Sequence, residues 1–141
     1  MVIVLKSGNR KIIMTKKKII STDKAPAAIG PYSQATVAGN LVFTAGQIPL
    51  DPTTGELVTG GIEEQTHQVL QNIRSLLQVA GSNMESVTKT TVFMTNLDDF
   101  NGMNEVYAKY LANKPPARTT VQVSGLPMGA NIEIECVAVT A

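Results

Sequence analysis

Cysteine, histidine and tryptophan are almost missing from this chain of 141 residues, which has one cysteine, one histidine and no tryptophan. The single cysteine, Cys136, cannot form a disulfide within the chain, so a reducing compartment such as the cytoplasm is the simplest expectation. One cysteine and one histidine, His67, are too few for an ordinary closed zinc site within one chain. The sequence therefore predicts neither a disulfide framework nor a bound metal.

Long apolar runs and nucleotide-binding motifs are missing as well. No apolar stretch approaches the ~20 residues of a transmembrane helix, and the apolar start at residues 1–5 is too short for the core of a signal peptide. The chain also lacks a phosphate-binding loop, the glycine fingerprint of dinucleotide-binding domains and the order of a Ser/His/Asp triad. These absences favour a protein that acts outside the membrane and without a nucleotide cofactor.

Charge is divided unevenly along the chain, although the formal net charge is only +1. Residues 1–24 hold seven of the 12 basic residues and one acid, whereas residues 25–141 hold five basic and ten acidic residues. An acidic body argues against nucleic acid as a partner. Because Met14 precedes three lysines like a second start, we expect residues 1–13 to be an extension outside the fold and residues 14–141 to form one domain. The alternative is a basic segment that contacts RNA or a membrane.

Hydrophobic periodicity predicts strands and two helices. Residues 62–80 have apolar side chains at steps of three and four, and Gly81 follows, as at the end of an amphipathic helix. A second helix is expected over about 99–112. The predicted strands are 18–21, 33–37, 41–47, 87–95, 118–124 and 131–140. The order β-β-β-α-β-α-β-β is typical of an α+β fold in which both helices cover one face of the sheet.

Alternation along the last two strands predicts which side chains face the helices. The apolar sets are Ile132, Ile134, Cys136 and Ala138 in one strand and Thr119, Val121 and Val123 in the other. We assign both sets to the helix side, which places Arg118 and Thr120 on the open face together with Glu133. Two valines share that face, and a monomer would not leave them exposed. The open face is therefore expected to be a subunit interface with a site inside it.

Five segments, in chain order, resemble the signatures of the RidA/YjgF family of reactive-intermediate deaminases. They are APAAIGPYSQ at 25–34, AGQIP at 45–49, PARTTVQV at 116–123, LP at 126–127 and IEIE at 132–135. The resemblance covers about residues 18–141. It implies a chorismate-mutase-like fold and a homotrimer, in which three sheets form a central barrel with the helices outside and clefts between subunits. It also implies a cytoplasmic hydrolase that converts 2-iminobutanoate or 2-iminopropanoate to the 2-keto acid and ammonia, with no cofactor.

The resemblance assigns the central chemistry to three residues. Arg118 would bind the substrate carboxylate, because a guanidinium group matches a carboxylate through two parallel hydrogen bonds. Glu133 would orient or activate the attacking water, since an electrophilic imine carbon mainly needs a placed water and proton transfer. Thr120 stands where many relatives have cysteine. Its hydroxyl would hold the water or the imine nitrogen, and thiol catalysis is excluded at this position.

Four further positions match residues that line the site in the family: Tyr32, Ala45, Gly46 and Asn104. Phe100, one helical turn before Asn104, would add an apolar wall to the site. Tyr32 would cap the cleft, and Gly46 would let the backbone approach the ligand closely. From the residues alone, plain packing roles for Tyr32 and Phe100 stay open.

Other residues and other functions are also open to prediction. We expect Glu135 to be structural, Cys136 to be an inert core thiol and His67 to be exposed. One alternative function is an RNA-cleaving translation inhibitor, which the acidic body and the single histidine disfavour. The other is a non-catalytic trimer that senses small metabolites or acts like a chaperone, and Arg118 and Glu133 would serve it equally well.

Overall fold

The computed structural model describes residues 3–8 and 10–141. Its strands are β1 (Ile3–Ser7), β2 (Arg10–Met14), β3 (Lys18–Ile20), β4 (Ala35–Ala38), β5 (Leu41–Thr44), β6 (Val87–Met94), β7 (Ala117–Gln122) and β8 (Ile132–Val139). Its α-helices are α1 (Ile62–Val79) and α2 (Phe100–Leu111), and its short 3-10 helices are η1 (Met84–Ser86), η2 (Leu97–Asp99) and η3 (Pro127–Gly129). From β3 onward the strands and α-helices follow the predicted order, so the predicted α+β fold is confirmed.

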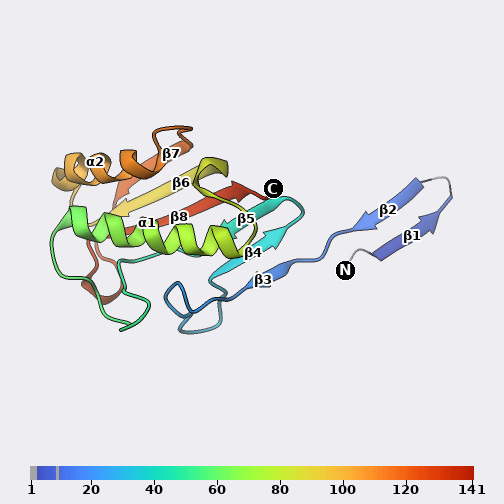
Figure 1. Cartoon of the computed structure of the whole chain (residues 1–141), viewed down its shortest axis with the longest axis horizontal. Helices are drawn as coiled ribbons and strands as arrows, with labels where there is room; N and C mark the ends of the chain where they lie inside the picture. Colours follow the sequence, from blue (N-terminus) through green and yellow to red (C-terminus); the bar gives the residue numbers. More distant parts are fainter. Residues whose placement is uncertain (1–2, 9) are drawn as a thin grey trace.

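Six strands form one mixed sheet in the order β3-β4-β5-β8-β6-β7. Strands β6 and β7 run parallel and are joined through α2, whereas the other neighbours are antiparallel. Figure 1 shows α1 and α2 on the same face of this sheet. The prediction that the helices cover a single face is confirmed, and strand β7 lies at the edge of the sheet.

Helix α1 is defined by its ends and by its apolar stripe. The Gly61 N–H donates to the Glu64 carboxylate at 2.8 Å, which satisfies a free backbone donor of the first turn. At the other end Gly81 has a φ of 79°, a conformation that glycine adopts without steric cost. Between these ends one helix face is buried against the sheet: Ile62, Val69, Leu70, Ile73, Leu76 and Leu77. The predicted helix is thus confirmed to within one residue of its C-terminal end.

The core lies between this helix pair and the sheet. Strand β8 contributes the four side chains assigned to the helix side from its alternation, and all are at most 3% exposed: Ile132, Ile134, Cys136 and Ala138. Helix α2 adds buried Met103, Val106, Tyr107 and Leu111. The assignment for β8 is therefore confirmed.

The assignment for β7 is wrong. Thr90 of β6 is 1% exposed on the helix side, and it pairs with Cys136 of β8 and with Arg118 of β7. Paired residues share a face, so Arg118 and Thr120 point to the helix side, whereas Val121 lies on the open face and is 37% exposed. The apolar side of an edge strand need not face the helices when the open face of the sheet is itself apolar.

The open face carries exposed apolar side chains from several strands. Leu41 and Phe43 of β5 are 36% and 41% exposed, and Val137 and Val139 of β8 are half-buried. No described helix covers this face. Together with Val121 of β7, these side chains spread apolar surface over three strands of one face, which is typical of an interface.

Strands β1 and β2 form a separate two-stranded antiparallel sheet. Figure 1 shows this hairpin extending away from the six-stranded sheet. Of the expected extension over residues 1–13, residues 1, 2 and 9 lie outside the described residues. That residues 1–13 are dispensable stays a prediction.

Candidate active site

Arg118 is held by one face of helix α2. Its Nη1 donates to the Asn104 Oδ1 at 2.7 Å. The guanidinium carbon lies 4.7 Å from the centre of the Tyr107 ring and 5.4 Å from the centre of the Phe100 ring, both within cation–π range. We call Arg118, Asn104, Phe100 and Thr120 the arginine half-site. A cavity of about 380 Å³ opens beside it, with Arg118, Asn104 and Tyr107 in its wall.

Two prolines precede the strand that carries this arginine. Pro115 and Pro116 cannot continue helix α2, and they line the same cavity. Strand β7 begins at Ala117, so Arg118 lies at the strand start beside the end of the helix.

The Thr120 hydroxyl belongs to the same face. Its Oγ1 is buried and, among the described residues, has no hydrogen-bond partner. A buried hydroxyl without a partner costs about 1–3 kcal/mol, so its retention calls for an explanation. A hydrogen bond between this hydroxyl and a bound ligand or water would explain it.

Glu133 lies on the open face, against Gly46. Phe43 pairs with Val137, and Gln47 pairs with Ile134. Between these two pairs lie three residues after β5 (44–46) but only two residues of β8 (135–136), so the chain forms a β-bulge here. The bulge brings Gly46 so close to Glu133 that a Cβ at this glycine would stand 2.8 Å from the Glu133 Cδ. Any side chain at this position would have to displace the Glu133 carboxyl group.

The Glu133 carboxyl is half-buried. Burial raises its pKa above the ordinary glutamate value, and the neighbouring Glu135 charge raises it further. Among the described residues the only ion pair joins Lys114 and Glu85, so neither Glu133 nor Arg118 forms an ion pair in that part of the chain. A carboxylate with a raised pKa and no partner is suited to proton transfer.

Tyr32 and Gly46 line a second cavity, of about 330 Å³, whose wall also includes Met128. Tyr32 is 54% exposed, and its hydroxyl accepts a hydrogen bond from the Ile29 N–H at 3.1 Å. The adjacent Ala45 N–H donates to the Gln34 carbonyl at 2.9 Å. We call Tyr32, Ala45, Gly46 and Glu133 the glutamate half-site.

One chain does not bring the two half-sites together. We expected Glu133 to lie on the strand next to Arg118 and on the same face. Strand β6 separates β8 from β7, and the two side chains project from opposite faces of the sheet. The three residues predicted to carry the chemistry are therefore divided between the two half-sites, with Arg118 and Thr120 in one and Glu133 in the other.

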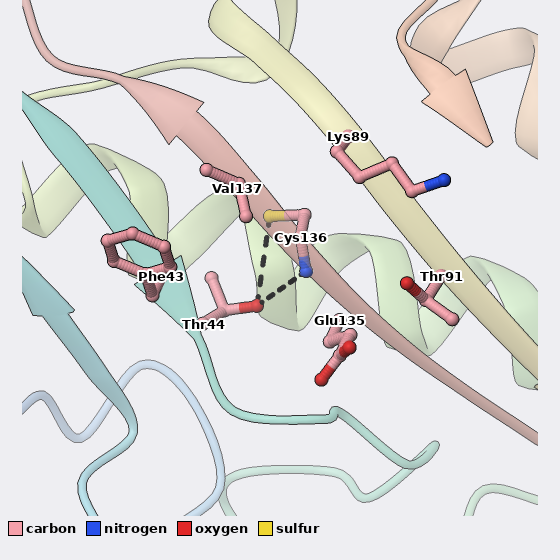
Figure 2. Close-up of a pocket in the computed structure, with 7 residues that line it drawn as sticks. All are labelled: Phe43, Thr44, Lys89, Thr91, Glu135, Cys136 and Val137. Carbon is pink, nitrogen blue, oxygen red and sulfur yellow. Dashed lines mark hydrogen bonds between the residues drawn. The ribbon is translucent and has the colours of Figure 1, made fainter. Parts of the chain in front are cut away.

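A third cavity, of about 190 Å³, lies on the open face (Figure 2). Figure 2 shows Lys89, Thr91 and Glu135 around it, together with the Thr44 hydroxyl bonded to Cys136. Burial raises the pKa of the Cys136 thiol to about 11, so the thiolate is scarce at neutral pH. This agrees with the expected inert core thiol.

His67 lies on the outside of the helix layer, as expected. Its Nδ1 is 2.6 Å from the Tyr110 hydroxyl, and its Nε2 is 3.0 Å from the Gln71 amide nitrogen. Both partners belong to the helices, so His67 takes part in helix packing and in neither half-site.

Two supporting residues were missed from the sequence. Gln34 is 5% exposed, and its side chain bonds the backbone of Thr22, Ala25 and Pro26, which shapes the loop that carries Tyr32. Tyr107 of α2 is the second, and its ring contacts Arg118. The available signal for Gln34 was an amide side chain at the end of a largely apolar signature. The signal for Tyr107 was its position three residues after Asn104, which places both on one face of the helix.

The chain is similar to a known protein family and to several characterised proteins. The Endoribonuclease L-PSP family matches residues 22–140. Reactive Intermediate Deaminase A, chloroplastic, of Arabidopsis thaliana is 52% identical over 123 residues, 87% of this chain and 66% of that protein. The human 2-iminobutanoate/2-iminopropanoate deaminase is 46% identical over 123 residues, 87% of this chain and 90% of that protein. The crystal structure of E. coli TdcF with bound serine superposes with a TM-score of 0.83 at 42% identity, over 88% of this chain and 99% of that one.

The chain therefore belongs to the Endoribonuclease L-PSP family, which is the RidA/YjgF family that its signatures resemble. Within the described part of the chain, no helix has the length and apolar character needed to cross a membrane. Nor do three or more His, Cys, Asp or Glu side chains gather there as metal ligands would.

Proposed function

We propose that the protein is a hydrolytic deaminase that converts 2-imino acids, with 2-iminobutanoate and 2-iminopropanoate as expected substrates, to 2-keto acids and ammonia. The observation that carries the proposal is the arginine half-site. It presents a guanidinium group, fixed on one side by Asn104 and two aromatic rings, at a cavity of about 380 Å³. A carboxylate is the group that such a fork matches best. The relatives named as deaminases, and the serine in the TdcF structure, point to substrates of this kind.

The chemistry needs no more than these side chains and water. Arg118 holds the carboxylate, and water adds to the imine carbon while Glu133 takes a proton from it. The imine reacts in its protonated form, so this addition gives a carbinolamine. Glu133 returns its proton to the nitrogen, and the carbon–nitrogen bond breaks as the hydroxyl proton passes to Glu133, which leaves a carbonyl and ammonia. The Thr120 hydroxyl, which is buried without a hydrogen-bond partner among the described residues, holds the water or the imine nitrogen. Tyr32 covers the ligand, and Ala45 and Gly46 lie along it.

We also propose that three copies assemble with their open faces inward, so that the arginine half-site of one chain meets the glutamate half-site of the next. The exposed Leu41, Phe43 and Val121 on that face support the assembly, and the location of the half-sites on opposite faces supports a shared site. Light scattering should give about three times the chain mass of 15.0 kDa. A stable monomer would contradict both statements.

The cytoplasm is the proposed compartment, because the lone Cys136 is a free thiol. Turnover is tested with 2-iminobutanoate generated in the cuvette by a dehydratase, with 2-ketobutyrate release as the signal. Hydrolysis faster than the spontaneous rate supports the proposal. Binding of 2-ketobutyrate without any acceleration would favour a metabolite-sensing trimer.

RNA cleavage is the second candidate, because the family's description names an endoribonuclease. Against it, residues 25–141 hold five basic and ten acidic residues, and the one histidine is bonded within the helix layer. Cleavage of a labelled RNA by the purified protein, lost together with imine hydrolysis in Arg118→Ala, would favour this candidate.

A further inference from the structure

We propose that Tyr107, anchored by Thr90, is a positioning residue that fixes the Arg118 guanidinium for carboxylate binding. This inference rests on the proposed function. It concerns a residue that is proposed to act on the reaction through its contact with the arginine.

The first observation is the anchor. The hydroxyl groups of Thr90 and Tyr107 lie 2.6 Å apart, and the two residues are 1% and 6% exposed. A buried hydroxyl pair of this kind fixes the ring relative to the strand, because breaking it would leave both groups unsatisfied.

The second observation is the register of strands β6 and β7. Thr90 is the direct partner of Arg118 across the β6–β7 ladder. The residue that holds the ring therefore belongs to the same strand pair as the arginine that the ring supports. A shift of α2 along the sheet would break the hydroxyl pair before it moved the ring away from Arg118.

The third observation is the helix face. Phe100, Asn104 and Tyr107 follow one another at steps of four and three, so they share one side of α2. Asn104 binds one edge of the guanidinium group, and the two rings lie against it at 4.7 and 5.4 Å. Burial raises the Tyr107 pKa, so the ring stays neutral beside the arginine.

Holding an arginine in one conformation removes part of the entropy cost of binding its ligand. Because the carboxylate is present in substrate, transition state and product, such a loss affects KM and product affinity and leaves kcat unchanged. In Tyr107→Leu we expect KM and the Kd for 2-ketobutyrate to rise about 3- to 30-fold, while kcat stays within about twofold. Tyr107→Phe, which keeps the ring, should restore most of this affinity, with a residual loss of about 2- to 5-fold.

The chain supplies a matched control. Tyr110 is also on α2. Its hydroxyl lies 2.6 Å from the His67 Nδ1, and the centre of its ring lies 4.8 Å from the guanidinium carbon of Arg74. Tyr110→Leu should leave KM at the wild-type value. An equal rise of KM in Tyr110→Leu and Tyr107→Leu would show a general loosening of α2 and would overturn the proposal.

A second measurement needs no ligand. The chain has three arginines, Arg10, Arg74 and Arg118, whose side-chain Nε–H groups can be followed by ¹⁵N relaxation. Tyr107→Leu should lower the order parameter of the Arg118 signal and leave Arg74 unchanged, with the reverse pattern in Tyr110→Leu. An Arg118 signal equally ordered in Tyr107→Leu and in the wild type would overturn the inference. A wild-type protein that neither binds 2-ketobutyrate nor hydrolyses imines would overturn the proposed function alone.

Discussion

The two half-sites are built in different ways. In the arginine half-site the charged group is held by a hydrogen bond of 2.7 Å and by two aromatic rings. In the glutamate half-site the Glu133 carboxylate rests against the bare backbone of Gly46, and its pKa is raised by burial. The first arrangement suits a group that must bind the same carboxylate throughout the reaction. The second suits a group that must exchange protons, since a carboxylate tied by strong hydrogen bonds would be a weaker base.

The largest effect is expected in the arginine half-site. Arg118→Ala should abolish turnover and weaken 2-ketobutyrate binding about 30- to several-thousand-fold, because losing one partner of a buried charged pair costs about 2–5 kcal/mol. Calorimetric titration of the keto acid measures this. Wild-type affinity in the variant would place the carboxylate elsewhere.

Glu133→Gln should separate binding from chemistry. The substitution keeps the shape of the side chain and removes the base, so kcat should fall about 10²- to 10⁴-fold while 2-ketobutyrate binds as before. The same titration, beside the imine-hydrolysis assay, checks both parts. A fully active variant would mean that another group activates the water.

Gly46→Ala tests the glutamate half-site without replacing Glu133 itself. The new methyl group would displace Glu133, so we expect kcat to fall about 10- to 100-fold. Gly125→Ala is the control, because no atom lies within 4 Å of its Cβ position. Equal rates in both variants would show that the position of Glu133 is not critical.

Thr120→Val should have a smaller effect. The side chain keeps its shape and loses a buried hydroxyl that has no hydrogen-bond partner in the described part of the chain, so the melting temperature should stay equal or rise. Turnover should fall less than about 10-fold, since an accessory hydrogen bond contributes about 0.5–1.5 kcal/mol. A clear drop in the melting temperature would assign the hydroxyl to folding.

The smallest effect is expected outside both half-sites. A chain that starts at Met14 should keep the melting temperature and turnover of the full chain, because β1 and β2 pair only with each other among the described strands. Thermal unfolding and the hydrolysis assay check this. A large loss of either would make the hairpin part of the domain.

Sequence patterns predicted the elements well and the faces less well. Helix α1 and strand β8 could be predicted because their apolar side chains repeat at the period of the element and are buried by a single layer. The direction of the two faces of strand β7 could not be predicted. This strand lies at the sheet edge, and its more apolar side, with Val121, is on the open face. Alternation reports that the two faces differ, and it does not report which one the helices cover.

The site residues came from the resemblance, and their separation came from the structure. No local pattern shows that β6 lies between the strands of Arg118 and Glu133, since strand order depends on pairing between distant segments. The Tyr107–Thr90 contact is equally remote in sequence, and a buried tyrosine at helical spacing looks like any core residue.

Subunit mixing tests the shared site most directly. Arg118→Ala and Glu133→Gln chains are each expected to be inactive, and equal amounts are unfolded together and reassembled. If each site combines Arg118 of one chain with Glu133 of the next, the chance that both are intact is one half times one half, so about a quarter of the wild-type activity should return. If both residues served the same site within one chain, the mixture would stay as inactive as its parts, and that result would contradict the account.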